Sequence, residues 1–184
     1  MAGRSNPGET GANPVRRIGV PFALAAVVVA LDQTLKAIVV AALGPDQSDH
    51  RIEVLGAILA LEYVENTGAA FGALRGQGGL LSALALLTVG ALIAYYRTLA
   101  TPSRPITLAL GLLLGGAMGN LADRLRLGYV VDFVAVGVWP KFNLADAAIT
   151  VGVVLLGWHL LAPHPGSDLP AQDQDQHHDQ EDAR

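Results

Sequence analysis

Two aspartates stand at the ends of one short connection, Asp132 in GYVVDFVAVG and Asp146 in FNLADAAITVG. Two carboxylates that share a site of low dielectric constant do not both ionise easily, so such a pair holds one proton near neutral pH. One carboxylate can then deprotonate a water molecule while the other protonates a carbonyl oxygen or a leaving amine, as in aspartic proteases. The chain has no GxSxG motif, no cysteine and no Gly-rich phosphate loop, and none of its five histidines forms an HExxH pattern. The aspartate pair is therefore the candidate for catalysis, and we expect no metal and no other cofactor.

Each aspartate also has a purely structural explanation when it is taken alone. Asp132 could be a solvated loop residue, although its neighbours are apolar and β-branched. Asn143 and Asp146 begin an apolar segment, and an Asn N-cap followed by an Asp in the first turn satisfies free N–H groups and suits the helix dipole. Local sequence does not separate these explanations from a catalytic one.

Other polar residues also lie in or beside apolar segments, where an unpaired polar group costs several kcal/mol. Asp32 and Lys36 are one helical turn apart, so they can pair either to neutralise one another or to support an active site. Asn66 in ENTGAAFG fits a turn, and Asn120 shares a helix face with Arg124. A salt bridge between Asp123 and Arg124 at a helix end would leave Asn120 unexplained.

The composition points to the elements that must position these residues. The chain is 52% hydrophobic and 15% charged, and its mean hydropathy is +0.42. These values are too apolar for an ordinary soluble domain and favour spans of about 20 residues. Four apolar segments fit, at about 18–42, 80–96, 106–122 and 145–161. We predict a mainly α membrane protein with four transmembrane helices.

Basic residues and hydrophobic alternation complete the predicted arrangement. Arginines precede the first span and join the second to the third, so the positive-inside rule puts both termini in the cytoplasm. Segments 43–79 and 123–143 would then lie outside, and the alternation in IEVLGAILALEYVEN predicts strands of a small extracytoplasmic β-sheet. On this topology most of the polar residues fall near the outer interface, which favours a common site.

The two ends of the chain differ from this core. Residues 1–17 are rich in Gly, Pro and Asn, and residues 163–184 form an acidic Asp/Gln/His-rich tail, so both are expected to be disordered and cytoplasmic. Asp32 and Lys36 interrupt the first apolar segment, which therefore reads as a retained span and not as a cleaved signal peptide. Residues 18–162 form the expected four-span domain.

Four blocks of the sequence resemble the conserved blocks of a known family. LDQTLK, VENTGAAFG, GNLADRLRLGYVVDF and FNLADAAITVG look like those of lipoprotein signal peptidase, also called signal peptidase II, and the resemblance covers roughly residues 18–162. It implies an intramembrane aspartyl endopeptidase that removes signal peptides from diacylglyceryl-modified bacterial prolipoproteins, cutting before the lipidated cysteine. It also implies that Asp132 and Asp146 are the catalytic pair. By the same resemblance, six residues bind substrate or support the pair: Asp32, Lys36, Asn66, Asn120, Arg124 and Asn143.

The resemblance further implies partners and a location. The partners would be prolipoproteins that carry a diacylglyceryl-cysteine and the membrane lipids, with no nucleic acid. The chain would cross the bacterial cytoplasmic membrane several times, with the active site near the outer face. A proton-coupled transporter is the alternative, but a proton relay should spread its acids across the membrane depth. A non-catalytic scaffold would leave Asp132 and the amides unexplained.

Overall fold

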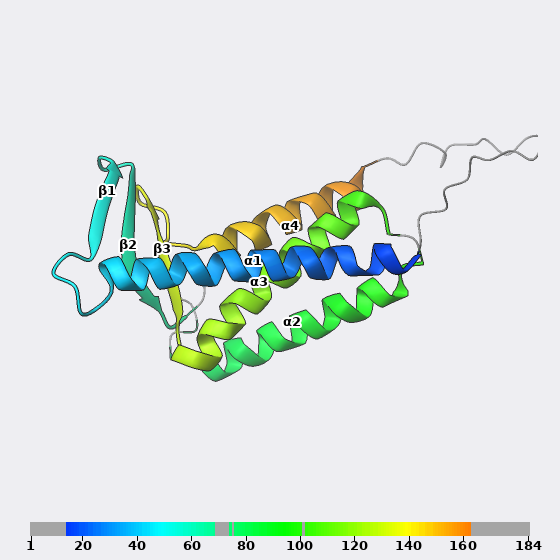
Figure 1. The fold of residues 1–184 in the computed structure, drawn as a ribbon, viewed down its shortest axis with the longest axis horizontal. Coiled ribbons are helices and arrows are strands. Elements are labelled where there is room, and N and C mark those ends of the chain that lie inside the picture. The colour runs from blue at the N-terminus through cyan, green and yellow to red at the C-terminus, as the bar shows by residue number, and fades with distance from the viewer. Residues whose placement is uncertain (1–13, 69–73, 75, 101, 163–184) are drawn as a thin grey trace, which may run out of the picture.

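Four long apolar helices and a small sheet make up the computed structural model, which describes residues 14–68, 74, 76–100 and 102–162. Figure 1 shows the helices side by side, with the sheet at one end of them and with the start of the first helix and the end of the last at the other. The helices are α1 Pro14–Leu43, α2 Gly78–Thr98, α3 Arg104–Leu127 and α4 Leu144–Leu161. The strands are β1 Arg51–Leu55, β2 Leu59–Asn66 and β3 Val130–Val136.

All four predicted spans are present, and each helix is long and apolar enough to cross a membrane. Two boundaries differ from the prediction. The first helix begins at Pro14, before the predicted start at residue 18, and α3 continues to Leu127 through part of segment 123–143, which we expected outside. It stops at Gly128, whose left-handed backbone (φ 83°) lets its N–H bond to the Arg124 carbonyl. The predicted disordered ends, apart from residues 14–17, lie outside the described residues.

Helix α3 is the centre of the bundle. Small residues on its surface let α1 and α4 come close, as is usual between membrane helices. A Cβ atom added at Gly115 would lie 2.9 Å from the Ala25 carbonyl oxygen of α1, and one added at Gly119 would lie 2.8 Å from Asp32 Oδ2. These glycines therefore set the distance between α3 and the polar stretch of α1.

The sheet is antiparallel, with strand order β1-β2-β3. The alternation in segment 43–79 correctly predicted strands there, but it did not show that segment 123–143 supplies β3. In the register of β2 with β3, Val64 pairs with Asp132. One face of the sheet packs on the end of α1, where Val39, Leu43 and Phe133 form a buried cluster. This contact fixes β3, and with it Asp132, against the helices.

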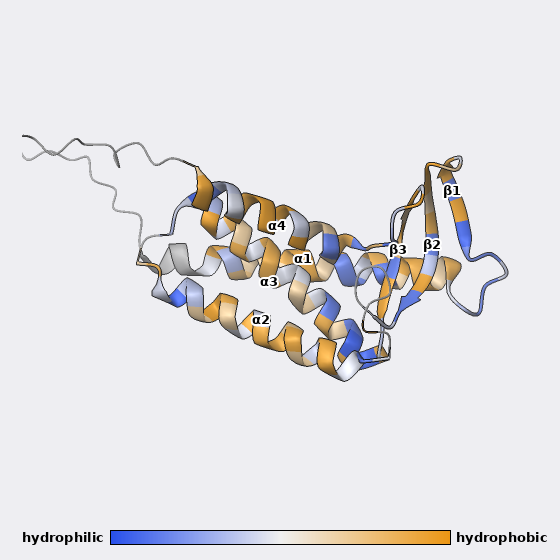
Figure 2. Ribbon diagram, turned by 180° about the vertical axis from the view of Figure 1, so that it is seen from behind, coloured by the Kyte–Doolittle hydropathy of each residue, from blue (hydrophilic) through white to orange (hydrophobic). Residues whose placement is uncertain are grey.

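Figure 2 shows apolar residues along most of the helices and hydrophilic residues gathered where the helices meet the sheet. Asp32, Asn120, Asp123, Asp132 and Asn143 are buried in this region. Buried polar groups need hydrogen-bond partners, so this end of the bundle must contain a connected polar network.

Candidate active site

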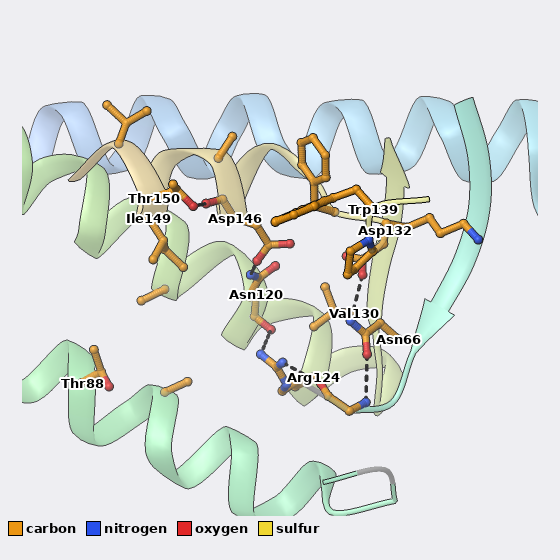
Figure 3. Close-up of a pocket in the computed structure, with 18 residues that line it drawn as sticks. Asn66, Thr88, Asn120, Arg124, Val130, Asp132, Trp139, Asp146, Ile149 and Thr150 are labelled. Atoms are coloured by element: carbon orange, nitrogen blue, oxygen red, sulfur yellow. Dashed lines mark hydrogen bonds between the residues drawn. The ribbon is translucent and has the colours of Figure 1, made fainter. Parts of the chain in front are cut away.

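Asp132 and Asp146 lie in one polar network at the junction of the sheet and the helices (Figure 3). Asp132, on β3, accepts hydrogen bonds from Asn66 Nδ2 and Asn143 Nδ2, both at 2.8 Å. Asp146, in the first turn of α4, accepts from Asn120 Nδ2 at 2.8 Å and from the Asn143 backbone N–H at 3.2 Å. Asn143 is thus the residue that connects the two carboxylates.

The N-cap predicted at Asn143 exists together with this link. Its side-chain oxygen accepts from the Asp146 backbone N–H at 2.9 Å, and Asp146 bonds back, which completes a capping box. The cap uses the oxygen of the Asn143 amide, which leaves its NH₂ group for Asp132. The structural and functional explanations are therefore compatible.

A second buried cluster supports the first from α1. Lys36 Nζ lies 2.8 Å from Asp32 Oδ2 and 2.8 Å from Asp123 Oδ2, and it donates to Asn120 Oδ1 at 3.1 Å. Asp32 Oδ1 accepts from the Ala145 backbone N–H at 3.0 Å, in the first turn of α4. The cluster is therefore connected to the Asp146 carboxylate by hydrogen bonds through Asn120. It is connected to α4, the helix that carries Asp146, through the Ala145 backbone N–H.

Asp123 and Gln33 belong to this network although they were not among the predicted site residues. Asp123 pairs with Lys36, and not with Arg124 as the simple salt-bridge explanation required. Its two oxygens also accept from Gln33 Nε2 at 2.8 Å and from the Val131 backbone N–H at 3.2 Å. Asp123 therefore joins α1, α3 and β3. The positions of both residues in the sequence could have identified them, because Gln33 follows Asp32 and Asp123 lies one helical turn after Asn120.

Asn66 and Arg124 line the cavity together with the two aspartates. Asn66 forms the expected turn, because its Oδ1 accepts from the Gly68 backbone N–H at 3.0 Å, and its amide is left to bind Asp132. The Arg124 guanidinium makes long contacts of 3.4 Å to the Asn120 carbonyl oxygen and 3.5 Å to the Gly68 carbonyl oxygen. It thus brings a cation to the cavity wall shared with both aspartates.

Burial of Asp132 raises the pKa of its carboxyl to about 6. The hydrogen bond from Asn66 acts in the opposite direction, and the negative charge of Asp146 raises the pKa further. Asp132 therefore has a pKa close to neutrality, as general acid–base catalysis requires.

A cavity of about 750 Å³ opens on these residues. Its sheet end carries charged side chains, including both aspartates, beside aromatic residues of the loop after β3. Its other end lies between α2 and α4, with Thr88 on one side and Ile149 and Thr150 on the other (Figure 3). An elongated, partly apolar ligand would fit a cavity of this form. Within the described residues, no group of three or more His, Cys, Asp or Glu side chains could hold a metal ion.

The family described as Signal peptidase (SPase) II matches this chain over residues 24–162. The chain belongs to the signal peptidase II family. Signal peptidase II enzymes are aspartic peptidases that remove signal peptides from prolipoproteins, so the predicted family, fold and enzyme class are confirmed. The chain is a multi-pass membrane protein, and the transporter alternative has no support among its relatives.

Several named relatives agree with this membership. The lipoprotein signal peptidase of Moorella thermoacetica is 46% identical over 146 residues, which cover 78% of this chain and 95% of that protein. The enzyme of the same name from Syntrophomonas wolfei is 47% identical over 130 residues, or 70% of this chain and 84% of that protein. The lipoprotein signal peptidase of Rhodococcus jostii is 42% identical over 141 residues, which cover 73% of this chain and 69% of that protein.

Two solved structures, both described as bacterial membrane enzymes studied by the in meso method, share the fold. One superposes with a TM-score of 0.70 at 32% identity, covering 78% of this chain and 88% of its own. The other has a TM-score of 0.69 at 31% identity, and the match covers 80% of this chain and 96% of that structure's chain. The arrangement of four helices and a sheet is therefore common to this signal peptidase II and known membrane enzymes.

Proposed function

We propose that Asp132 and Asp146 are the catalytic pair of this signal peptidase II. The observation that carries the proposal is the Asn143 link, because this one residue donates to both carboxylates at the wall of one cavity, from its side-chain NH₂ group to Asp132 and from its backbone N–H to Asp146. With one proton between them, one carboxylate activates water and the other protonates the leaving amine. A pair that shares its proton has no fixed assignment of base and acid before substrate binds.

The six other predicted site residues have supporting roles in this proposal. Asn66 and Asn143 orient Asp132, and Asn120 orients Asp146. Asp32 and Lys36 hold the first turn of α4 and the Asn120 amide. Arg124, on the cavity wall, supplies N–H donors to the carbonyl groups of a bound peptide. The developing oxyanion is stabilised by such preorganised donors.

The substrate in this proposal is a prolipoprotein that carries a diacylglyceryl group on the cysteine after the cleaved bond. The cavity supports this choice because its two ends differ in chemistry. Asp132 and Asp146 line the polar end, while Ala85 of α2 and Val151 of α4 line the apolar end. The peptide would occupy the polar end, and the acyl chains would lie in the apolar end, where lipid tails are the natural surroundings.

We further propose that the chain lies in the bacterial cytoplasmic membrane with both termini in the cytoplasm and the active site near the outer face. Arg97 and Arg104 flank the α2–α3 connection, which lies at the end of the bundle away from the sheet (Figure 1). Arg16 and Arg17 belong to the first turn of α1, at the same end. This clustering of basic residues supports a cytoplasmic position for that end.

The test uses Asp132→Asn and Asp146→Asn, which keep the side-chain size and remove the carboxylate. Each variant should cleave a diacylglyceryl-modified prolipoprotein in vesicles more slowly by a factor on the order of 10³ or more. Asp49→Asn is the matched control, because Asp49 is exposed in the connection after α1. Normal turnover in both single variants would refute the pair. Equal cleavage of a substrate without the diacylglyceryl group would refute the substrate class.

A further inference from the structure

The loop between β3 and α4, residues 137–142, is held firmly to the sheet. Gly137 has a φ of 48°, and its N–H bonds to the Ile58 carbonyl oxygen at 2.9 Å. The Trp139 N–H bonds to the Val136 carbonyl oxygen at 2.9 Å, and Phe142 is bridged to Val134. The loop therefore has a defined conformation before any substrate arrives.

This loop brings one large aromatic side chain to the cavity that holds the two aspartates. Trp139 lines the cavity, and Figure 3 shows it at the sheet end, on the side of Asp132 and Asp146. Its side chain is well exposed, at 63%, although Trp is an amphipathic residue with a large apolar surface. Pro140, which follows it, restricts the backbone further. An exposed indole on a rigid loop at a cavity wall is a ready contact surface for a ligand.

We propose that Trp139 is a substrate-binding residue that packs on the apolar peptide segment beside the scissile bond. This inference rests on the proposed function, since it concerns the substrate of the same site. Trp139 lies at the polar end, near the carboxylates, whereas the acyl chains are assigned to the apolar end between α2 and α4. The indole would press the peptide towards Asp132 and Asp146 and raise the affinity for substrate without entering the chemistry.

Kinetics provide the first test, with the full chain in vesicles and a diacylglyceryl-modified prolipoprotein as substrate. Trp139→Ala should raise KM about tenfold and leave kcat within about twofold, because an aromatic contact made equally in the bound and transition states is lost. Trp139→Phe should recover part of the KM effect. Val138→Ala, at the fully exposed neighbouring position, is the control and should match the parent. An unchanged KM, or a loss confined to kcat, would overturn the proposal.

A repeat in detergent micelles separates substrate binding from anchoring to the membrane surface, since Trp is also common at membrane interfaces. The KM effect should persist in micelles if Trp139 contacts the peptide. Equal KM values for Trp139→Ala and the parent in micelles, with a difference in vesicles alone, would assign Trp139 to the lipid surface and overturn the proposal.

Fluorescence provides a test that needs no cleavage. The chain has two tryptophans, and Trp158 is exposed near the end of α4 away from the sheet. Trp158→Phe therefore makes Trp139 the only reporter. A diacylglyceryl lipopeptide with a hydroxyethylene group in place of the scissile amide should shift its emission to shorter wavelength and protect it from iodide quenching. An unchanged signal at lipopeptide concentrations that fully inhibit cleavage would contradict the proposal.

The outcomes also separate the two proposals. If Asp132→Asn and Asp146→Asn retain turnover, the catalytic pair fails whatever the Trp139 signal shows. If both aspartate variants are inactive and Trp139→Ala is normal in KM, only the present inference fails.

Discussion

The side-chain amide of Asn143 donates to Asp132 Oδ1 at 2.8 Å while its oxygen caps the helix that carries Asp146. One residue therefore fixes both the start of α4 and the direction of a carboxylate on β3. A change in the cap would move the second aspartate relative to the first. The Asn143 amide has two functions: its oxygen caps α4, and its NH₂ group donates to Asp132. Substitutions can separate these functions, because some side chains keep the cap without the donor.

Asn143→Ser should keep the cap but lose the donor to Asp132, whereas Asn143→Ala should lose both. We expect the Ala variant to be less stable by about 1 kcal/mol or more and the Ser variant to stay near the parent. Both should lose activity, on the order of 10²-fold, because Asp132 loses an orienting partner. Thermal unfolding in detergent and cleavage rates provide the two measurements. A fully active Ser variant would show that the Asn143 donor has no part in catalysis.

Lys36→Met should destabilise the protein strongly, because it leaves Asp32 and Asp123 buried without their shared cation. Removing one partner of a buried ion pair costs about 3–5 kcal/mol. Lys141→Met is the control: Lys141 is exposed and lies 3.6 Å from Glu62, and such surface pairs contribute about 0–1 kcal/mol. Thermal unfolding of the two variants checks this prediction. Equal stability of the Lys36 and Lys141 variants would contradict the buried network.

Gly119→Ala should weaken the packing of α3 against α1, since the new Cβ would meet the Asp32 carboxylate at 2.8 Å. We expect a loss of about 1–3 kcal/mol, typical of overpacking, and a lower cleavage rate because Asp32 holds the first turn of α4. Gly90→Ala is the matched control, because a Cβ there meets nothing within 4 Å. Ala is a better helix former than Gly, so the control should be neutral or more stable. A Gly119 variant as stable as the Gly90 variant would rule out the close approach.

Protonation of Asp132 should make stability depend on pH. Its pKa rises from 3.8 to about 6 on folding, so the folded state holds this proton more tightly than the unfolded state. The resulting stabilisation is complete below pH 3.8 and is lost as the pH rises through about 6. Asp132→Asn should remove this loss, on the order of 2–3 kcal/mol between pH 4 and pH 7. The check compares unfolding of the parent and the variant at the two pH values. Identical pH slopes would mean that the Asp132 pKa is not raised.

The spans, the Asn143 N-cap and the Asp32–Lys36 pair were predictable because they depend on neighbours in the sequence. Strand β3 was missed because the hydrophobic periodicity of a short apolar run does not distinguish a strand from a segment of helix. The last turn of α3 was missed because Asp123, Arg124 and Arg126 look too polar for a membrane helix. Two of these residues have partners on α1, since Lys36 pairs with Asp123 and Gln33 accepts from Arg126. Arg124 instead contacts the Asn120 and Gly68 carbonyl oxygens.

Contacts between distant parts of the chain could not be predicted from spacing. Asn66 and Asp132 are 66 residues apart, and only the β2–β3 register brings them together. The motifs showed which polar residues to expect in the site, but not that Asn143 would link the two aspartates or that Asp123 would join the cluster.

The apolar end of the cavity, lined by Ala85 and Thr88 of α2 and by Ile149 and Val151 of α4, has a kinetic consequence. If acyl chains lie between these helices, the substrate arrives sideways from the bilayer and not from water. The cleavage rate then depends on the number of substrate molecules per lipid molecule. Adding inert lipid at constant volume would slow cleavage although every bulk concentration of enzyme and substrate stayed the same, so the membrane area of the cell becomes a determinant of the rate.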